Sequence, residues 1–148
     1  MAVETIEGIL VAAQPRRRKW GYGYYKELSF TLPGGSERKI AKVGAGSAMV
    51  DEIARGGAGR WFVSDADGGK GLCGVHRADG TRTYAHWSNL GPILLVVGML
   101  GVAVAIARFV FGYTELPVTP AILGPLLIAA WAWLRHQRLT AKKAFDAG

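Results

Sequence analysis

The sequence has one cysteine, no signal-peptide pattern and no complete catalytic motif, and each shortage excludes a class of protein. Cys73 is the single cysteine among 148 residues, which excludes a secreted domain held together by internal disulfides. The first residues include Glu4 and Glu7 and form no apolar run, so we expect no cleaved signal peptide.

The residues of a metal or cofactor site are also lacking. Cys73, His76 and His86 come nearest to a ligand set, but residues three apart on a strand point to opposite faces, and zinc needs a fourth ligand. The Gly-x-Gly pairs that begin at Gly21 and Gly44 lack the third glycine of a dinucleotide site. The sequence therefore predicts a non-catalytic protein with no metal and no cofactor.

Charge is nearly absent from two long stretches in the last third of the chain. Residues 91–112 carry only Arg108, and residues 118–134 carry no charge. A bilayer core of about 30 Å needs about 20 helical residues, and each stretch has about that length. We therefore predict two transmembrane helices, over about 91–112 and 117–135, that form a hairpin.

Acidic residues are fewer than basic ones, and the basic excess predicts the orientation of this hairpin. The chain has 18 Lys and Arg against 11 Asp and Glu. Arg135, Arg138, Lys142 and Lys143 follow the second stretch, whereas the loop between the stretches carries only Glu115. Positive flanks stay on the cytoplasmic side, so we expect both termini in the cytoplasm, at a bacterial inner (plasma) membrane. A basic balance also favours anionic lipid head groups as partners.

Arg108 is the one charge within a predicted span. It lies about one turn from the outer end, where its side chain can reach the head groups or pair with Glu115. If Arg108 faced a pore instead, the protein would be a small oligomeric channel or a transporter accessory subunit.

Small residues on the two predicted helices indicate where helices pack: Gly98, Gly101, Ala105 and Gly124. Small side chains allow close helix contact in lipid, where no aqueous driving force acts between helices. The two helices of one chain use them, or two chains do. We favour a protein partner or a homo-oligomer.

Residues 1–88 have the pattern of a β-domain. Alternation and turn residues predict strands over 3–14, 27–32, 37–43, 60–64, 72–76 and 82–87, with a short helix over 48–55. Pro15 is expected to end the first strand. This order predicts a small all-β barrel that is OB-like, with an SH3-like barrel as the alternative. The predicted domains are then a cytoplasmic barrel (1–88), two helices (89–135) and a basic cytoplasmic tail (136–148).

A basic and aromatic run after the first strand is the candidate ligand- or lipid-binding surface: Arg16, Arg17, Arg18, Lys19, Trp20, Tyr22 and Tyr24. Adjacent cations repel one another, so we expect an exposed loop. Such a loop suits anionic lipid head groups. Cations beside aromatic rings also hold single-stranded nucleic acid on OB barrels, which is the less favoured alternative.

Together these parts predict an integral membrane scaffold or adaptor, in which a barrel that binds partners is tethered by a helical hairpin. A membrane-tethered OB protein that binds nucleic acid or nucleotide remains an alternative, as does the channel or accessory subunit. In outline the chain resembles the membrane-anchored OB proteins that accompany membrane proteases, although there the barrel follows the helices. The resemblance covers no shared motif and implies no site residue.

Overall fold

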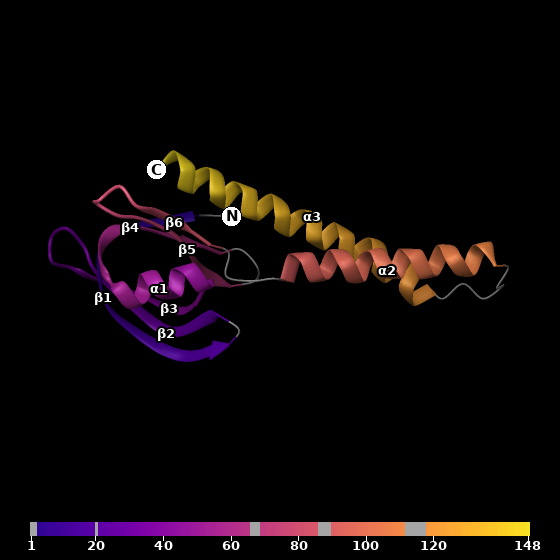
Figure 1. Cartoon of the computed structure of the whole chain (residues 1–148), viewed down its shortest axis with the longest axis horizontal. Helices are drawn as coiled ribbons and strands as arrows, with labels where there is room; N and C mark the ends of the chain where they lie inside the picture. Colours follow the sequence, from indigo (N-terminus) through magenta and orange to yellow (C-terminus); the bar gives the residue numbers. More distant parts are fainter. Residues whose placement is uncertain (1–2, 20, 66–68, 86–89, 112–117) are drawn as a thin grey trace. The chain divides into compact units, whose positions relative to one another are not determined.

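The computed structural model describes residues 3–19, 21–65, 69–85, 90–111 and 118–148 of the chain (Figure 1). The chain divides into two compact units. One contains Met1–Ser88 together with Arg138–Gly148, and the other contains Asn89–Gln137. The first unit, which we call the barrel unit, holds the β-sheet, and the second holds a pair of helices.

In its described residues, the barrel unit contains a six-stranded sheet, one short helix and the end of α3 (Val118–Ala147). Its elements are β1 (Val3–Lys19), β2 (Tyr22–Thr31), β3 (Glu37–Ala45), α1 (Ser47–Arg55), β4 (Gly57–Ser64), β5 (Lys70–His76) and β6 (Arg82–Tyr84). The predicted strands and the predicted short helix are therefore present, although several bounds differ.

The strands close into a barrel. They pair in the order β3-β2-β1-β4-β5-β6, and β3 also pairs in parallel with β5, from Val43 opposite Lys70 to Ala45 opposite Leu72. This second pairing joins the ends of a five-stranded sheet, while β6 extends it beyond β5. The prediction of a small all-β barrel is confirmed.

Apolar side chains fill the barrel. Trp61, Phe30 and Leu28 are fully buried, and the rings of Phe30 and Trp61 meet edge to face with centroids 5.8 Å apart. Met49 and Ile53 of α1 belong to the same core. The helix therefore completes the core instead of lying free on the surface.

A largely buried ion pair holds α1 against the barrel. Arg77, just after β5, donates from Nε to Oε2 of Glu52 at 2.7 Å and from Nη1 to the carbonyl oxygen of Gly56 at 2.8 Å. The Arg77 guanidinium also lies 5.7 Å from the ring centroid of Trp61. A carboxylate as buried as that of Glu52 is costly without a partner, so Arg77 stabilises this end of the helix.

The prediction that the first strand ends at Pro15 is wrong. β1 continues to Lys19, which pairs with Tyr22 of β2. The ladder is irregular immediately before and after Pro15. A proline is tolerated at such a point because the regular ladder does not need its missing N–H. The basic run therefore belongs to a strand and not to a loop.

The second unit pairs α2 (Leu90–Val110) with the first part of α3 (Val118–Ala147). Among the described residues, one helix is long and apolar enough to cross a membrane: Gly91–Val110, with a mean hydropathy of 2.6. α3 holds Pro125 inside the helix and carries charges from Arg135 onward. By length and composition, one of the two predicted spans is therefore supported.

α3 runs well past its predicted end near residue 135. The segment predicted as a basic tail, 136–148, is helical as far as Ala147. Its last turns belong to the barrel unit, where Phe145 packs with Phe62 and Cys73 in a second, smaller core. This segment is therefore part of the folded structure.

Candidate functional site

The basic and aromatic residues lie on a hairpin, residues 15–25, formed by the end of β1 and the start of β2; we call it the basic hairpin. Arg17 lies opposite Tyr24, and Lys19 lies opposite Tyr22. Directly opposite residues share a face of an antiparallel pair, and so do residues two apart along a strand. These four side chains therefore share one face of the hairpin.

The same register sends Arg18 to the other face. Arg18 lies opposite Gly23, and its guanidinium is 3.7 Å from the carboxylate of Asp51 on α1. Both side chains are exposed, so the pair adds little to stability. The pair places Arg18 beside α1, on the face opposite to that of Arg17 and Lys19.

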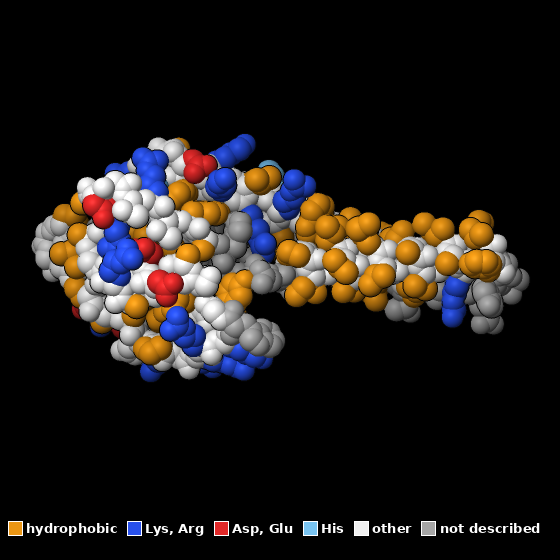
Figure 2. Space-filling model, viewed as in Figure 1, with side chains coloured by type: hydrophobic (Ala, Val, Ile, Leu, Met, Phe, Trp, Pro, Cys, Tyr) orange, Lys and Arg blue, Asp and Glu red, His pale blue; other side chains and the backbone are white. Residues whose placement is uncertain are grey.

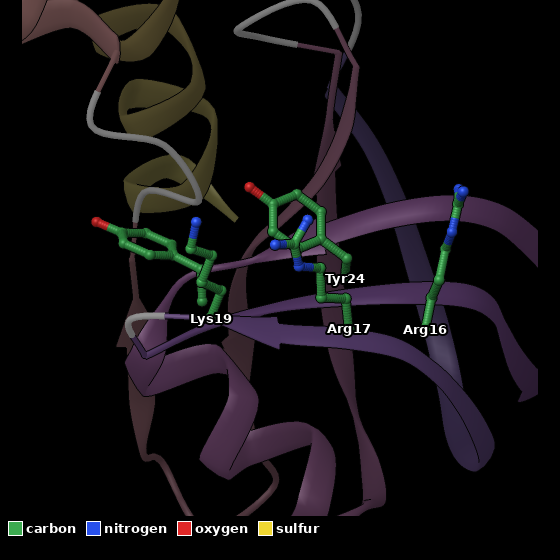
Figure 3. A pocket seen from close by; sticks show the side chains of 5 residues that line it. Arg16, Arg17, Lys19 and Tyr24 are labelled. Carbon is green, nitrogen blue, oxygen red and sulfur yellow. The ribbon is translucent and has the colours of Figure 1, made fainter.

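A surface hollow of about 430 Å³ lies on the first face of the basic hairpin. Its lining residues are Arg16, Arg17, Lys19, Tyr22 and Tyr24. Figure 3 shows the labelled side chains of Arg16, Arg17, Lys19 and Tyr24 extending to the same side of the strands. The described lining therefore combines positive charge with aromatic rings, and none of these five residues is a carboxylate.

The structure brings together most of the predicted binding residues, but not all. Arg18 does not line the first hollow; it lines a second one, of about 360 Å³, between the hairpin and α1, which Arg17 and Tyr24 also border. Trp20 lies outside the described residues. The hollow of 430 Å³ is therefore assigned to the five residues that line it.

Tyr25 anchors the base of the basic hairpin. It is buried, and its ring covers Gly23, where an added Cβ would lie 2.8 Å from Cε2 of Tyr25. Burial raises the pKa of Tyr25, and the nearby Arg18 guanidinium offsets only part of this effect. The phenol stays neutral at physiological pH, so it packs as part of the core.

The predicted packing glycines meet within one chain. A Cβ added at Gly98 would lie 3.0 Å from the carbonyl oxygen of Gly124, and one added at Gly101 would lie 3.2 Å from the Cα of Gly124. Ala105 is half-buried. Of the two alternatives, contact between the helices of one chain is the one that uses these glycines here.

Arg108 lies in the last turn of α2, and its side chain is exposed. A long cationic side chain at that position reaches the head-group region of a bilayer from the end of a span. Glu115, its predicted partner, lies outside the described residues.

The sequence patterns missed the second core. Phe62, Cys73 and Phe145 are buried together, with Val3 and Tyr84 packed against them. The Cys73 thiol donates to the carbonyl oxygen of Phe62 at 3.3 Å, and burial raises its pKa to about 12, so it is no nucleophile at neutral pH. A signal was available, because Phe62 stands within a run of large apolar residues, which indicates a strand buried on both faces.

His76 lies at the edge of this second core. Its ring centroid is 4.3 Å from that of Phe145 and 4.8 Å from that of Phe62, and its Nε2 atom is buried without a hydrogen-bond partner. Burial, followed by the charges of Arg82 and Arg60, lowers the pKa of His76. The imidazole is therefore held in its neutral form.

Metal-ligating side chains do not gather in the part of the chain that the structure describes, which includes Cys73 and His76 but not His86. No known protein family matches the chain, and no curated protein or solved structure is significantly similar to it. The case for function therefore depends on the geometry of the chain's own residues.

Proposed function

We propose that this protein is a non-catalytic, membrane-tethered adaptor: an OB-like barrel that binds a partner, held at the membrane by a two-helix hairpin with both termini on the cytoplasmic side. The observation that carries the proposal is the packing of Phe145, in the last turns of α3, against Phe62 of β4, with ring centroids 5.1 Å apart. If α2 crosses a bilayer, α3 must cross back, because β4 precedes α2 in the chain and Phe145 follows it.

The surface of α2 supports the membrane location. Only 6% of its apolar window is buried, and Figure 2 shows hydrophobic side chains over most of the visible face of this helix. Phe109, for example, is 73% exposed. Exposure of such a large apolar surface to water is unfavourable, whereas in a bilayer lipid chains would cover it.

The first part of α3 supports the return crossing. Ile122, Leu123 and Leu126 are exposed there, while Gly124 is the buried residue that meets α2. Large side chains outward and small ones at the helix contact are typical of helices packed in lipid. Pro125 is tolerated in a membrane helix when neighbouring groups satisfy the freed backbone carbonyl.

The strand connections favour the OB-like type of barrel. α1 joins β3 to β4, and β3 meets β5 in parallel at the point of closure. A five-stranded Greek-key barrel with this succession of elements is the arrangement of OB-folds. Apolar side chains fill its interior, so the binding surfaces of this adaptor are on its exterior, where the basic hairpin lies.

A cysteine-labelling experiment tests the membrane topology. In a Cys73→Ala background, single cysteines are placed by Ala2→Cys, Thr114→Cys and Ala147→Cys and treated with a membrane-impermeant maleimide on inverted vesicles and on spheroplasts. We expect labelling at positions 2 and 147 from the cytoplasmic side and at position 114 from the other side. Labelling of positions 2 and 147 from opposite sides would show one crossing and contradict the hairpin.

The adaptor role is tested by the mass of the complex extracted from native membranes. A defined homo-oligomer, or a stoichiometric complex with a second protein, is expected. Recovery of the chain as a monomer that carries no partner would contradict the proposal.

A further inference from the structure

We propose that the basic hairpin binds the phosphodiester of an anionic phospholipid head group, with Arg17 and Lys19 as its cationic ligands and Tyr22 and Tyr24 beside the head group. The lipid source of this phosphate rests on the proposed membrane tether. The phosphate chemistry rests on the geometry of the basic hairpin alone.

The first support is the way in which strand alternation sorts the cations. Arg17 and Lys19 are two apart on β1, so they share the face that carries the 430 Å³ hollow, while Arg18 turns to Asp51 on the other face. Arg16 stands at the irregularity next to Pro15 and joins the same hollow. An apparently uniform basic run is thereby divided into Arg18, which lies beside Asp51, and three cations that line one hollow.

The second support is the contrast with other exposed cations of the barrel unit. Several of these have carboxylate partners: Arg38 with Glu4, Arg60 with Glu7, and Lys39 with Glu27 and Glu37. Among the described residues, the hollow is lined by three cations and two tyrosines and by no carboxylate. A site of this composition attracts an oxyanion, and guanidinium groups match phosphate oxygens in a bidentate way.

The third support is preorganisation. Arg17, Arg18 and Lys19 each pair with a residue of β2, and Gly21 in the turn has a φ of 79°, which a side chain would strain. If binding had to order a flexible loop, the affinity would be lower. Strands that are already paired avoid this cost. The aromatic rings of Tyr22 and Tyr24 give the head group an amphipathic wall.

The tether favours lipid over soluble phosphate as the source. Only residues 85–89 separate β6 from α2, so a short connection joins the barrel to the helix that is apolar enough to cross a membrane. A short tether to a bilayer raises the effective concentration of head groups at the barrel. An open hollow of about 430 Å³ is also in the size range of a small-molecule site.

The experiment uses the full chain in nanodiscs and follows hydrogen exchange of residues 15–25. Discs of phosphatidylcholine alone are compared with discs of equal parts phosphatidylcholine and phosphatidylglycerol. We expect exchange in the basic hairpin to slow by about tenfold in the anionic discs. The double variant Arg17→Gln/Lys19→Gln should lose this protection. The matched control Arg38→Gln/Lys39→Gln, which removes the same charge from β3, should keep it.

Three outcomes would overturn the proposal. Equal loss of protection in the control variant would show attraction to net charge without a site. Equal protection by inorganic phosphate added to phosphatidylcholine discs would make the ligand a soluble phosphate. Stronger protection by an added oligothymidylate would assign the hairpin to single-stranded nucleic acid. None of these results bears on the number of membrane crossings, so the topology experiment fails or succeeds separately.

Discussion

The two units of this chain bury opposite kinds of residue. The barrel unit buries its largest side chains, including Trp61 and Phe30, and exposes charged ones. The helical unit buries Gly98 and Gly124 and exposes large apolar side chains such as Phe109. In water, burial of large apolar groups drives folding, whereas in lipid that drive is absent and close backbone contact takes its place. This difference is the one that the proposed membrane tether predicts, with the barrel unit in water and the helical unit in lipid.

The largest expected effect comes from emptying the barrel core. Trp61→Ala should lower the free energy of unfolding by about 3–5 kcal/mol, because it leaves a cavity among fully buried side chains. Phe109→Ala is the paired change on the helical unit and should cost less than about 0.5 kcal/mol, because that ring is exposed. Urea denaturation in nanodiscs, followed by near-ultraviolet circular dichroism, measures both. Equal losses of unfolding free energy in the two variants would mean that the Phe109 ring is buried, which would contradict the contrast between the two units.

Enlarging a small buried residue should destabilise the helical unit, just as removing a large buried side chain destabilises the barrel unit. Gly124→Leu should destabilise the helix pair by about 1–3 kcal/mol. Its added Cβ would lie 2.9 Å from the backbone nitrogen of Val102, which leaves no room. Ala129→Leu adds similar bulk at an exposed position of α3 and serves as the control. Thermal unfolding in nanodiscs should separate the variants; a Gly124→Leu protein as stable as the control would show that the helices do not pack through this glycine.

Backbone strain is a further point of comparison. Among the described residues, Lys42 of β3 is the one non-glycine with positive φ, at 56°. Lys42→Gly should therefore stabilise the barrel by about 1 kcal/mol, because glycine adopts this conformation freely. Ala41→Gly, next to it in the same strand, should destabilise by about 0.5–1 kcal/mol. Chemical denaturation of the two variants should give shifts of opposite sign.

The smallest expected effect concerns the segment of α3 that belongs to the barrel unit. The pKa of His76 is lowered in the folded state, so its neutral form stabilises the packing of Phe145 above the ordinary pKa of about 6.5. This contribution should be lost as the pH falls below that value. Arg60 and Arg82 oppose the protonated form, and Asp146 favours it.

Hydrogen exchange of residues 141–147, corrected for its intrinsic pH dependence, measures this loss. Protection should fall between about pH 7 and pH 5 in the natural chain and change little in His76→Phe. A profile that is the same in both proteins would assign the pH dependence to another group.

Part of this structure was predictable from local patterns. Alternation and the Asp79-Gly80 turn identify the strands of the barrel unit, and the apolar stretch 91–110, in which Arg108 is the one charge, identifies α2, because both depend on short-range periodicity and composition. The course of β1 past Pro15 was not predictable in this way. A proline normally ends a central strand, and only the pairing with β2, irregular at that residue, accommodates it.

The candidate site shows the same limit. The sequence by itself determined that basic and aromatic residues are concentrated between Arg16 and Tyr24. The tertiary structure decided which cations share it, since the register of β1 with β2 places Arg17 and Lys19 on one face and Arg18 beside Asp51 on the other. The tertiary structure also decided that residues 138–147 are part of the folded barrel unit. Their composition predicts a charged tail, but Phe145 packs against Phe62. Composition is a property of each stretch alone, whereas register and docking depend on partners far away in the chain.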